Sequence, residues 1–124
     1  MPDRPTHFEI AVDDPDRAEA FYTEVFGWTF NRYPGAPSYY GLAATGETHP
    51  GIDGALFQRS DDNNGTTLTM SVDSIEDSIK KVEAAGGKVH TPKMPIPGMG
   101  YFAVCLDTEG NRVGLFVNDE SATM

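Results

Sequence analysis

The chain has one cysteine, few basic residues and no long apolar run. Among its 124 residues, Lys and Arg together number 9 and Asp and Glu number 19, which gives a formal net charge of −10. That charge repels phosphate backbones and anionic membrane surfaces, so we expect no nucleic acid and no membrane as partners. No apolar stretch approaches the roughly 20 residues of a membrane-spanning helix. A lone Cys105 excludes an internal disulfide and a multi-cysteine metal cluster.

Length and composition predict a single globular domain over residues 1–124. A hydrophobic fraction of 39% and an aromatic fraction of 10% are ordinary for a chain that buries a core. The first residues, Met1-Pro-Asp-Arg-Pro-Thr6, lack the apolar stretch of a secretory signal. We therefore expect a cytoplasmic protein.

The first half of the sequence predicts strands around one helix. A strand over 7–12 lies between prolines, and Asp13 or Asp14 can cap a helix that begins at Pro15 and stops at Gly27. Further strands are expected over 28–33, 38–44 and 52–59.

The second half predicts the same order of elements. A strand over 66–72 precedes a helix capped by Asp73 or Ser74 and ending at Gly86-Gly87. The remaining expectations are a short strand over 88–91, a Pro/Gly-rich loop over 92–100, strands over 101–106 and 112–118, and a frayed tail over 119–124.

A strand-turn-strand signature stands near the end of the chain. The turn Asp107-Thr-Glu-Gly-Asn111 joins two runs rich in β-branched and aromatic residues, which indicates a hairpin. Gly114 lies inside the second strand of this hairpin. A glycine there weakens a strand and marks close approach by a ligand or by another backbone.

The halves superpose when the sequence is shifted by 60 residues, which places Val12-Asp13 over Val72-Asp73 and Gly54 over Gly114. The interpretation is an α+β fold with two β-α-β-β-β modules in one domain, at about 5–60 and about 65–118. Each module has one helix to cover one face of its sheet. The uncovered faces are expected to enclose a ligand cavity.

Two motifs resemble the vicinal oxygen chelate superfamily, which includes glyoxalase I, bleomycin-resistance proteins and extradiol dioxygenases. They are the pattern from His7 through Phe21-Tyr22 to Phe26-Gly27-Trp28, and Asp107-x-Glu-Gly-Asn111. The resemblance implies the glyoxalase/bleomycin-resistance fold, a half-open mixed sheet around a cavity, and a homodimer.

The resemblance also implies where a metal would bind. In the superfamily's metal enzymes, the first and last strands of each module supply His or Glu ligands. The matching positions here are His7, Thr67, Gly54 and Gly114, so His7 alone is a ligand-type residue. We expect a degenerate site with no metal cofactor; the alternative is a divalent metal held by His7 with Gln58, Glu9 or His90.

The predicted function is binding of a small apolar or aromatic molecule, with the reaction unknown. His7 and Glu9 share a strand face and are the candidates for acid/base catalysis. The candidate ligand-binding residues are His7, Glu9, Gly54, Thr67, Thr69, Tyr101 and Gly114. Two alternatives stay open: a metal-dependent lyase or dioxygenase that uses His7, and a non-catalytic dimer that sequesters a drug or metabolite.

Overall fold

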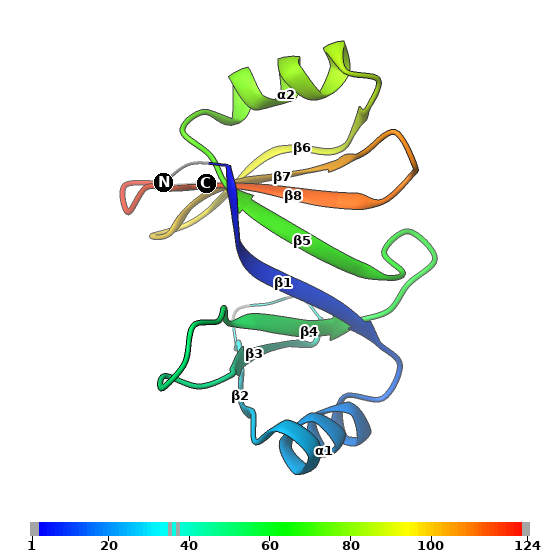
Figure 1. The fold of residues 1–124 in the computed structure, drawn as a ribbon, viewed down its shortest axis with the longest axis vertical. Helices are drawn as coiled ribbons and strands as arrows, with labels where there is room; N and C mark the ends of the chain where they lie inside the picture. The colour runs from blue at the N-terminus through cyan, green and yellow to red at the C-terminus, as the bar shows by residue number, and fades with distance from the viewer. Residues whose placement is uncertain (1–2, 35, 37, 123–124) are drawn as a thin grey trace. The chain divides into compact units, whose positions relative to one another are not determined.

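A computed structural model describes residues 3–34, 36 and 38–122 of the chain. These residues divide into two compact units (Figure 1). The N-terminal unit comprises residues 7–66, and the C-terminal unit comprises residues 67–122 with residues 3–6. Neither helix in the described part of the chain is long and apolar enough to cross a membrane.

The N-terminal unit is a mixed four-stranded sheet with one helix. In chain order it contains the part of β1 (Arg4–Val12) from His7 onward, α1 (Pro15–Phe26), β2 (Thr29–Arg32), β3 (Tyr40–Ala44) and β4 (Gly54–Gln58). The strand order is β2-β3-β4-β1, with β1 parallel to β4 and the other pairs antiparallel. The predicted β-α-β-β-β order is confirmed in this unit.

Helix α1 begins and ends at the capping residues that the sequence predicted. Asp14 accepts a hydrogen bond from the backbone N–H of Arg17 at 3.1 Å, and Pro15 occupies the first turn. Gly27 ends the helix with φ 77°, a left-handed conformation that favours glycine. Helix α1 packs through Tyr22, whose ring stacks on Trp28 with centroids 4.8 Å apart.

The residue that precedes β3 is also joined to α1 by a polar contact. The Tyr39 hydroxyl donates to Glu19 at 2.6 Å, and the Arg32 guanidinium lies 5.1 Å above the Tyr39 ring. Burial and the neighbouring Glu19 carboxylate raise the pKa of Tyr39. A side chain at Gly41 would occupy the position of the Tyr39 hydroxyl, so the glycine makes this contact possible.

The C-terminal unit repeats the plan. Its elements are β5 (Thr66–Ser71), α2 (Ile75–Ala84), β6 (Lys88–Ile96), β7 (Gly100–Leu106) and β8 (Arg112–Asn118), in the strand order β5-β8-β7-β6. Strand β5 is parallel to β8, and the other pairs are antiparallel. Figure 1 shows α2 beside β6, β7 and β8, which it contacts. The core beneath it contains Val72, Ile75, Ala103, Cys105 and Leu115.

Strand β6 is longer than the sequence predicted. Its observed range of Lys88–Ile96 includes Pro92 and Pro95, which we expected in a loop. Proline has no N–H to donate, but β6 lies at the end of this unit's strand order, and its pairing with β7 shifts register between Val89 and Met94. An edge strand with such irregularities tolerates prolines that a central strand does not.

The expectation of a frayed tail is wrong for the described part of that segment. The backbone N–H of Asp119 donates to Met99 O at 2.8 Å, and Gly98 N–H donates to Ala122 O at 3.0 Å. Ala122 is buried. Hydrogen bonds to the turn between β6 and β7 therefore fix residues 119–122, while residues 123 and 124 lie outside the described residues.

The predicted hairpin turn between β7 and β8 is confirmed. The Asp107 carboxylate accepts the backbone N–H groups of Asn111 at 2.8 Å and Glu109 at 2.9 Å, and Gly110 has φ 85°. These hydrogen bonds, led by that from Asn111, hold the pKa of Asp107 below its ordinary value.

We therefore expect Asp107→Ala to lower stability at pH 7, because two backbone donors lose their acceptor. The pKa of Asp107 is lower in the folded protein than in the unfolded chain. The carboxylate's contribution to the free energy of unfolding is therefore complete above the ordinary pKa of about 3.9, and it is lost as pH falls through the folded-state pKa. Urea unfolding at pH 7 and pH 2.5 should show a smaller gap between variant and wild type at pH 2.5. Asp61→Ala, at an exposed loop position, is the control. An equal gap at both pH values would contradict the prediction.

Candidate functional site

A three-residue hydrogen-bond network lies on one face of the N-terminal unit's sheet. The Tyr40 hydroxyl donates to Glu9 Oε2 at 2.6 Å and lies 3.1 Å from His7 Nε2. The same Glu9 oxygen is 3.8 Å from His7 Nε2. The side chains of His7 and Glu9 are 30% and 25% exposed, so solvent reaches a network that is otherwise half-buried.

The sheet order explains how these side chains meet. His7 and Glu9 are two residues apart on β1 and share a face, as predicted. Tyr40 comes from β3, which is separated from β1 by β4. Between them lies Ala55 of β4, which pairs with Glu9 and with Leu42. Its small side chain leaves room for the Tyr40 ring to reach the carboxylate.

Sequence reasoning did not identify Tyr40 as a partner of His7 and Glu9. The alternation of β3 assigns Tyr40 to a face, but only the strand order shows that this face includes β1. Burial, and then the Glu9 carboxylate, raise the pKa of Tyr40 far above its ordinary value. The phenol therefore keeps its proton at neutral pH and acts as a hydrogen-bond donor.

Gly54 does not share the face of this network. A side chain at Gly54 would meet the Phe8 ring, whose nearest carbons lie 2.5 Å from the position of an added Cβ. Phe8 in turn packs on Trp28, with ring centroids 5.4 Å apart, beneath α1. The position that we matched to a metal ligand therefore faces Phe8 on the helix-covered side of the sheet.

A one-residue difference between the modules explains this error. The parallel pairs are Glu9 with Ala55 in one unit and Thr69 with Gly114 in the other. Glu9 and Thr69 are 60 residues apart, but Ala55 and Gly114 are only 59 apart (114 − 55). Because a shift of one residue moves a side chain to the opposite face, the counterpart of Gly114 is Ala55 and not Gly54.

In the C-terminal unit, the structure brings together three of the predicted residues. Thr69 pairs with Gly114, and its Oγ1 lies 2.5 Å from where a Cβ of Gly114 would stand. Thr67, two residues earlier on β5, is 1% exposed and accepts a hydrogen bond from Arg112 Nε at 3.0 Å. The absence of a side chain at Gly114 therefore makes room for the Thr69 side chain. The close approach expected at this glycine is made by another residue of the same chain.

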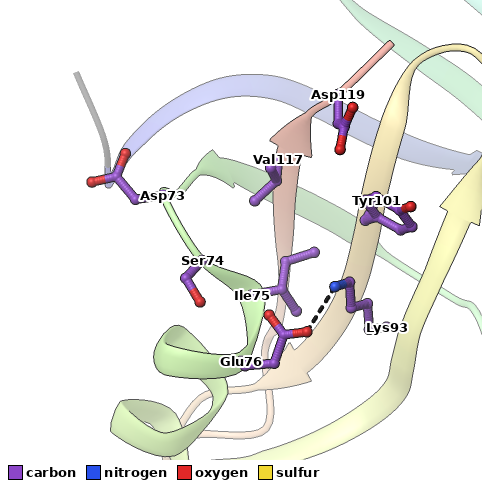
Figure 2. Close-up of a pocket in the computed structure, with 8 residues that line it drawn as sticks. All are labelled: Asp73, Ser74, Ile75, Glu76, Lys93, Tyr101, Val117 and Asp119. Carbon is purple, nitrogen blue, oxygen red and sulfur yellow. Dashed lines mark hydrogen bonds and ion pairs between the residues drawn. The ribbon is translucent and has the colours of Figure 1, made fainter. Parts of the chain in front are cut away.

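Tyr101 lies on the other, α2-covered side of this unit, where it packs against the core. It lines a pocket of about 170 Å³ with residues from the start of α2, β6 and β8, shown in Figure 2. Lys93 Nζ lies 4.6 Å from the Tyr101 ring centroid and 2.7 Å from the Glu76 carboxylate. This pocket contains Tyr101 but none of the other predicted binding residues.

The donor groups do not fit the metal that the resemblance implies. Catalytic metal sites commonly use three protein ligands. On the face of His7 and Glu9, the last-strand position is Ala55, and the corresponding position in the other unit is Gly114. The Gln58 amide donates instead to the backbone carbonyls of residues 12 and 13, at 3.3 and 3.1 Å. Among the described residues, no three His, Cys, Asp or Glu side chains are placed to hold a metal ion.

The contact between Gly54 and Phe8 can be tested by mutation. We expect Gly54→Ala to lower the free energy of unfolding by about 1–3 kcal/mol, because the added methyl group overlaps the Phe8 ring. Gly51→Ala is the control, since nothing lies within 4 Å of a Cβ at that position. In urea unfolding, Phe8→Ala in the Gly54→Ala background should cost less than Phe8→Ala alone. Additive effects of the two substitutions would refute the contact.

Comparisons with known proteins agree with the fold. The family profile described as the Glyoxalase/Bleomycin resistance protein/Dioxygenase superfamily matches residues 4–115. The anthracycline biosynthesis protein DnrV of Streptomyces peucetius is 29% identical over 123 residues, an alignment that covers 88% of this chain and 45% of DnrV. The chain thus spans a little under half the length of DnrV and of three other curated relatives.

Solved structures with the same fold include two at 16% identity. The hypothetical protein BH1468 of Bacillus halodurans matches with a TM-score of 0.71 over 100% of both chains. Methylmalonyl-CoA epimerase of Mycobacterium tuberculosis matches with a TM-score of 0.68 over 93% of this chain and 87% of the epimerase. The family profile spans most of the sequence, both units have the β-α-β-β-β order, and the protein belongs to the Glyoxalase/Bleomycin resistance protein/Dioxygenase superfamily.

Proposed function

We propose that this protein binds a small, largely apolar or aromatic molecule on the sheet face that carries His7, Glu9 and Tyr40. The observation that carries the proposal is their hydrogen-bond network, with distances of 2.6 and 3.1 Å. It concentrates polar groups at one point of a sheet, and it keeps two of them partly exposed. A few convergent polar groups within apolar surroundings are typical of small-molecule sites.

The surroundings of the network are apolar. On β3, Leu42 lies two residues after Tyr40 and is 39% exposed. On β4, Phe57 pairs directly with Tyr40 and therefore shares its face. Phe57 is buried beneath this face, and the exposed Leu42 offers hydrophobic surface to a ligand, while the network supplies the polar contact that fixes its orientation.

One relative supports an aromatic ligand. DnrV is named for the biosynthesis of anthracyclines, which are flat polycyclic aromatic compounds. This chain spans less than half the length of DnrV, so an aromatic ligand for this chain is part of the proposal. The same proposal includes a homodimer, which the family resemblance implies and light scattering measures. It also includes a cytoplasmic location, which the sequence implies and cell fractionation measures.

The chemistry of the site favours recognition of a ligand by hydrogen bonds and apolar contacts over coordination of a metal ion. The superfamily's metal enzymes place ligands at four positions, and in this chain only His7 is a ligand-type residue among them. Glu9 is a second possible donor on the same strand. Within the network, the tyrosine hydroxyl bonds to both side chains. Such hydrogen bonding restrains the imidazole and the carboxylate and prepares them to contact a bound molecule.

We expect a thermal-shift screen with aromatic alcohols and anthracycline-type compounds to yield stabilisers of the wild-type protein. His7→Ala should weaken binding of a stabiliser by about tenfold or more, because the central polar contact of the site is removed. His49→Ala is the control, since His49 is an exposed loop histidine of the same unit, hydrogen-bonded to its neighbour Thr48. Equal loss of affinity in both variants, or no loss in either, would refute the assignment.

Two further measurements decide between the rival functions. Metal analysis of protein purified without chelator should give a substoichiometric divalent metal content; stoichiometric metal that is lost in His7→Ala would establish the metal-dependent alternative instead. Mass spectrometry of a stabiliser after incubation separates binding from turnover. Recovery of the compound unchanged supports sequestration, and conversion to a product defines an enzyme.

A further inference from the structure

The direction of one proton determines what His7 offers to a ligand. A phenol has a single proton, and Tyr40 donates it to Glu9 Oε2 across 2.6 Å. The Tyr40 oxygen can then act only as an acceptor toward His7 Nε2, 3.1 Å away. Because two acceptors cannot share a hydrogen bond, Nε2 must carry a proton for this contact to be favourable.

The second ring nitrogen follows from the first. In a neutral imidazole only one nitrogen is protonated, so an N–H at Nε2 leaves a lone pair at Nδ1. Within the described part of the chain, no hydrogen bond to His7 Nδ1 is formed. The His7 side chain is 30% exposed, and the imidazole therefore retains an acceptor that its protein neighbours do not use.

We infer that the ligand presents a hydrogen-bond donor, an O–H or N–H group, to His7 Nδ1, and that Tyr40 is the positioning residue that fixes this imidazole tautomer. The inference rests on the proposed function and narrows its ligand class to phenols, enols, alcohols and N–H heterocycles. Ethers and other compounds that offer only acceptors lack the proton that this nitrogen requires. Tyr40 acts through His7, and the strand geometry of β1 and β3 sets both positions.

Tyr39 provides a matched control for Tyr40. The two tyrosines are adjacent, and each donates to a glutamate at 2.6 Å, but Tyr39 bonds to Glu19 of α1 on the opposite side of the sheet. Tyr39→Phe and Tyr40→Phe therefore remove the same atom and the same type of hydrogen bond. Only Tyr40→Phe removes the acceptor that faces His7 Nε2.

The tautomer can be measured without any ligand. In the full chain labelled with ¹⁵N-histidine, long-range ¹H–¹⁵N correlation at pH 8.5, well above the ordinary histidine pKa of about 6.5, distinguishes the two ring nitrogens. His7→Ala identifies the His7 signals. We expect a protonated Nε2 in the wild type and in Tyr39→Phe, and a mixture of tautomers in Tyr40→Phe. A protonated Nδ1 as the main form in the wild type would overturn the inference.

Ligand selectivity gives the second test, with 2-naphthol and phenol compared with their methyl ethers by calorimetry at pH 8. We expect each hydroxyl compound to bind at least about fivefold more tightly than its ether in the wild type and in Tyr39→Phe, and this ratio to fall in Tyr40→Phe. Equal binding of hydroxyl compound and ether in the wild type would overturn this inference and leave the proposed function standing. Binding of none of the four compounds would overturn the proposed function and this inference with it.

Discussion

The parallel pairing of the first and last strands within each unit is the constraint on which the candidate site depends. In the N-terminal unit it sets Glu9 beside Ala55, and in the C-terminal unit it sets Thr69 beside Gly114. These registers decide which side chains share a face, because a change of one residue would exchange the two faces. The His7 network, the position of Phe8 over Gly54 and the contact of Thr69 with Gly114 all follow from them.

The same constraint separates what the two units can do. In the N-terminal unit the open side carries an imidazole, a carboxylate and a phenol in hydrogen-bond contact. In the C-terminal unit the matching first-strand positions carry hydroxyl groups, and Thr67 is already bonded to Arg112. Duplication has thus kept the backbone plan but not the chemistry. The first copy places an imidazole, a carboxylate and a phenol together, while the second copy places a buried Thr67 against Arg112 and a half-buried Thr69 against Gly114.

Much of the fold could be predicted from the sequence because the helix signals are local. Asp14, Pro15 and Gly27 define α1 by capping chemistry that needs no knowledge of the rest of the chain, and Asp107 defines the last hairpin in the same way. Strand β6 was misjudged because its prolines are tolerated only by an edge strand, and strand order is not visible in a single sequence. The tail was misjudged because its anchors are backbone hydrogen bonds.

The candidate site was predicted only in part, for a related reason. His7 and Glu9 could be placed on one face by the two-residue period of a strand, but Tyr40 joins them across an intervening strand. The error at Gly54 came from a repeat that holds for the first strands and fails by one residue for the last. When a β structure is duplicated, the pairing of strands must therefore be known in each copy before a residue can be assigned to one face of the sheet. Shifting the whole sequence by one constant number does not give this pairing.

The tyrosines at the start of β3 depend on the alignment of that strand, since Tyr39 directly precedes it and Tyr40 begins it. If β3 slid by one position so that Tyr40 took the place of Tyr39, Gly41 would stand beside Glu9 and Leu42 would take the position of Gly41. A side chain at that position overlaps the phenol on the helix side of the sheet. The missing side chain of Gly41 thus disfavours the shifted alignment, and it helps to determine which tyrosine the imidazole meets.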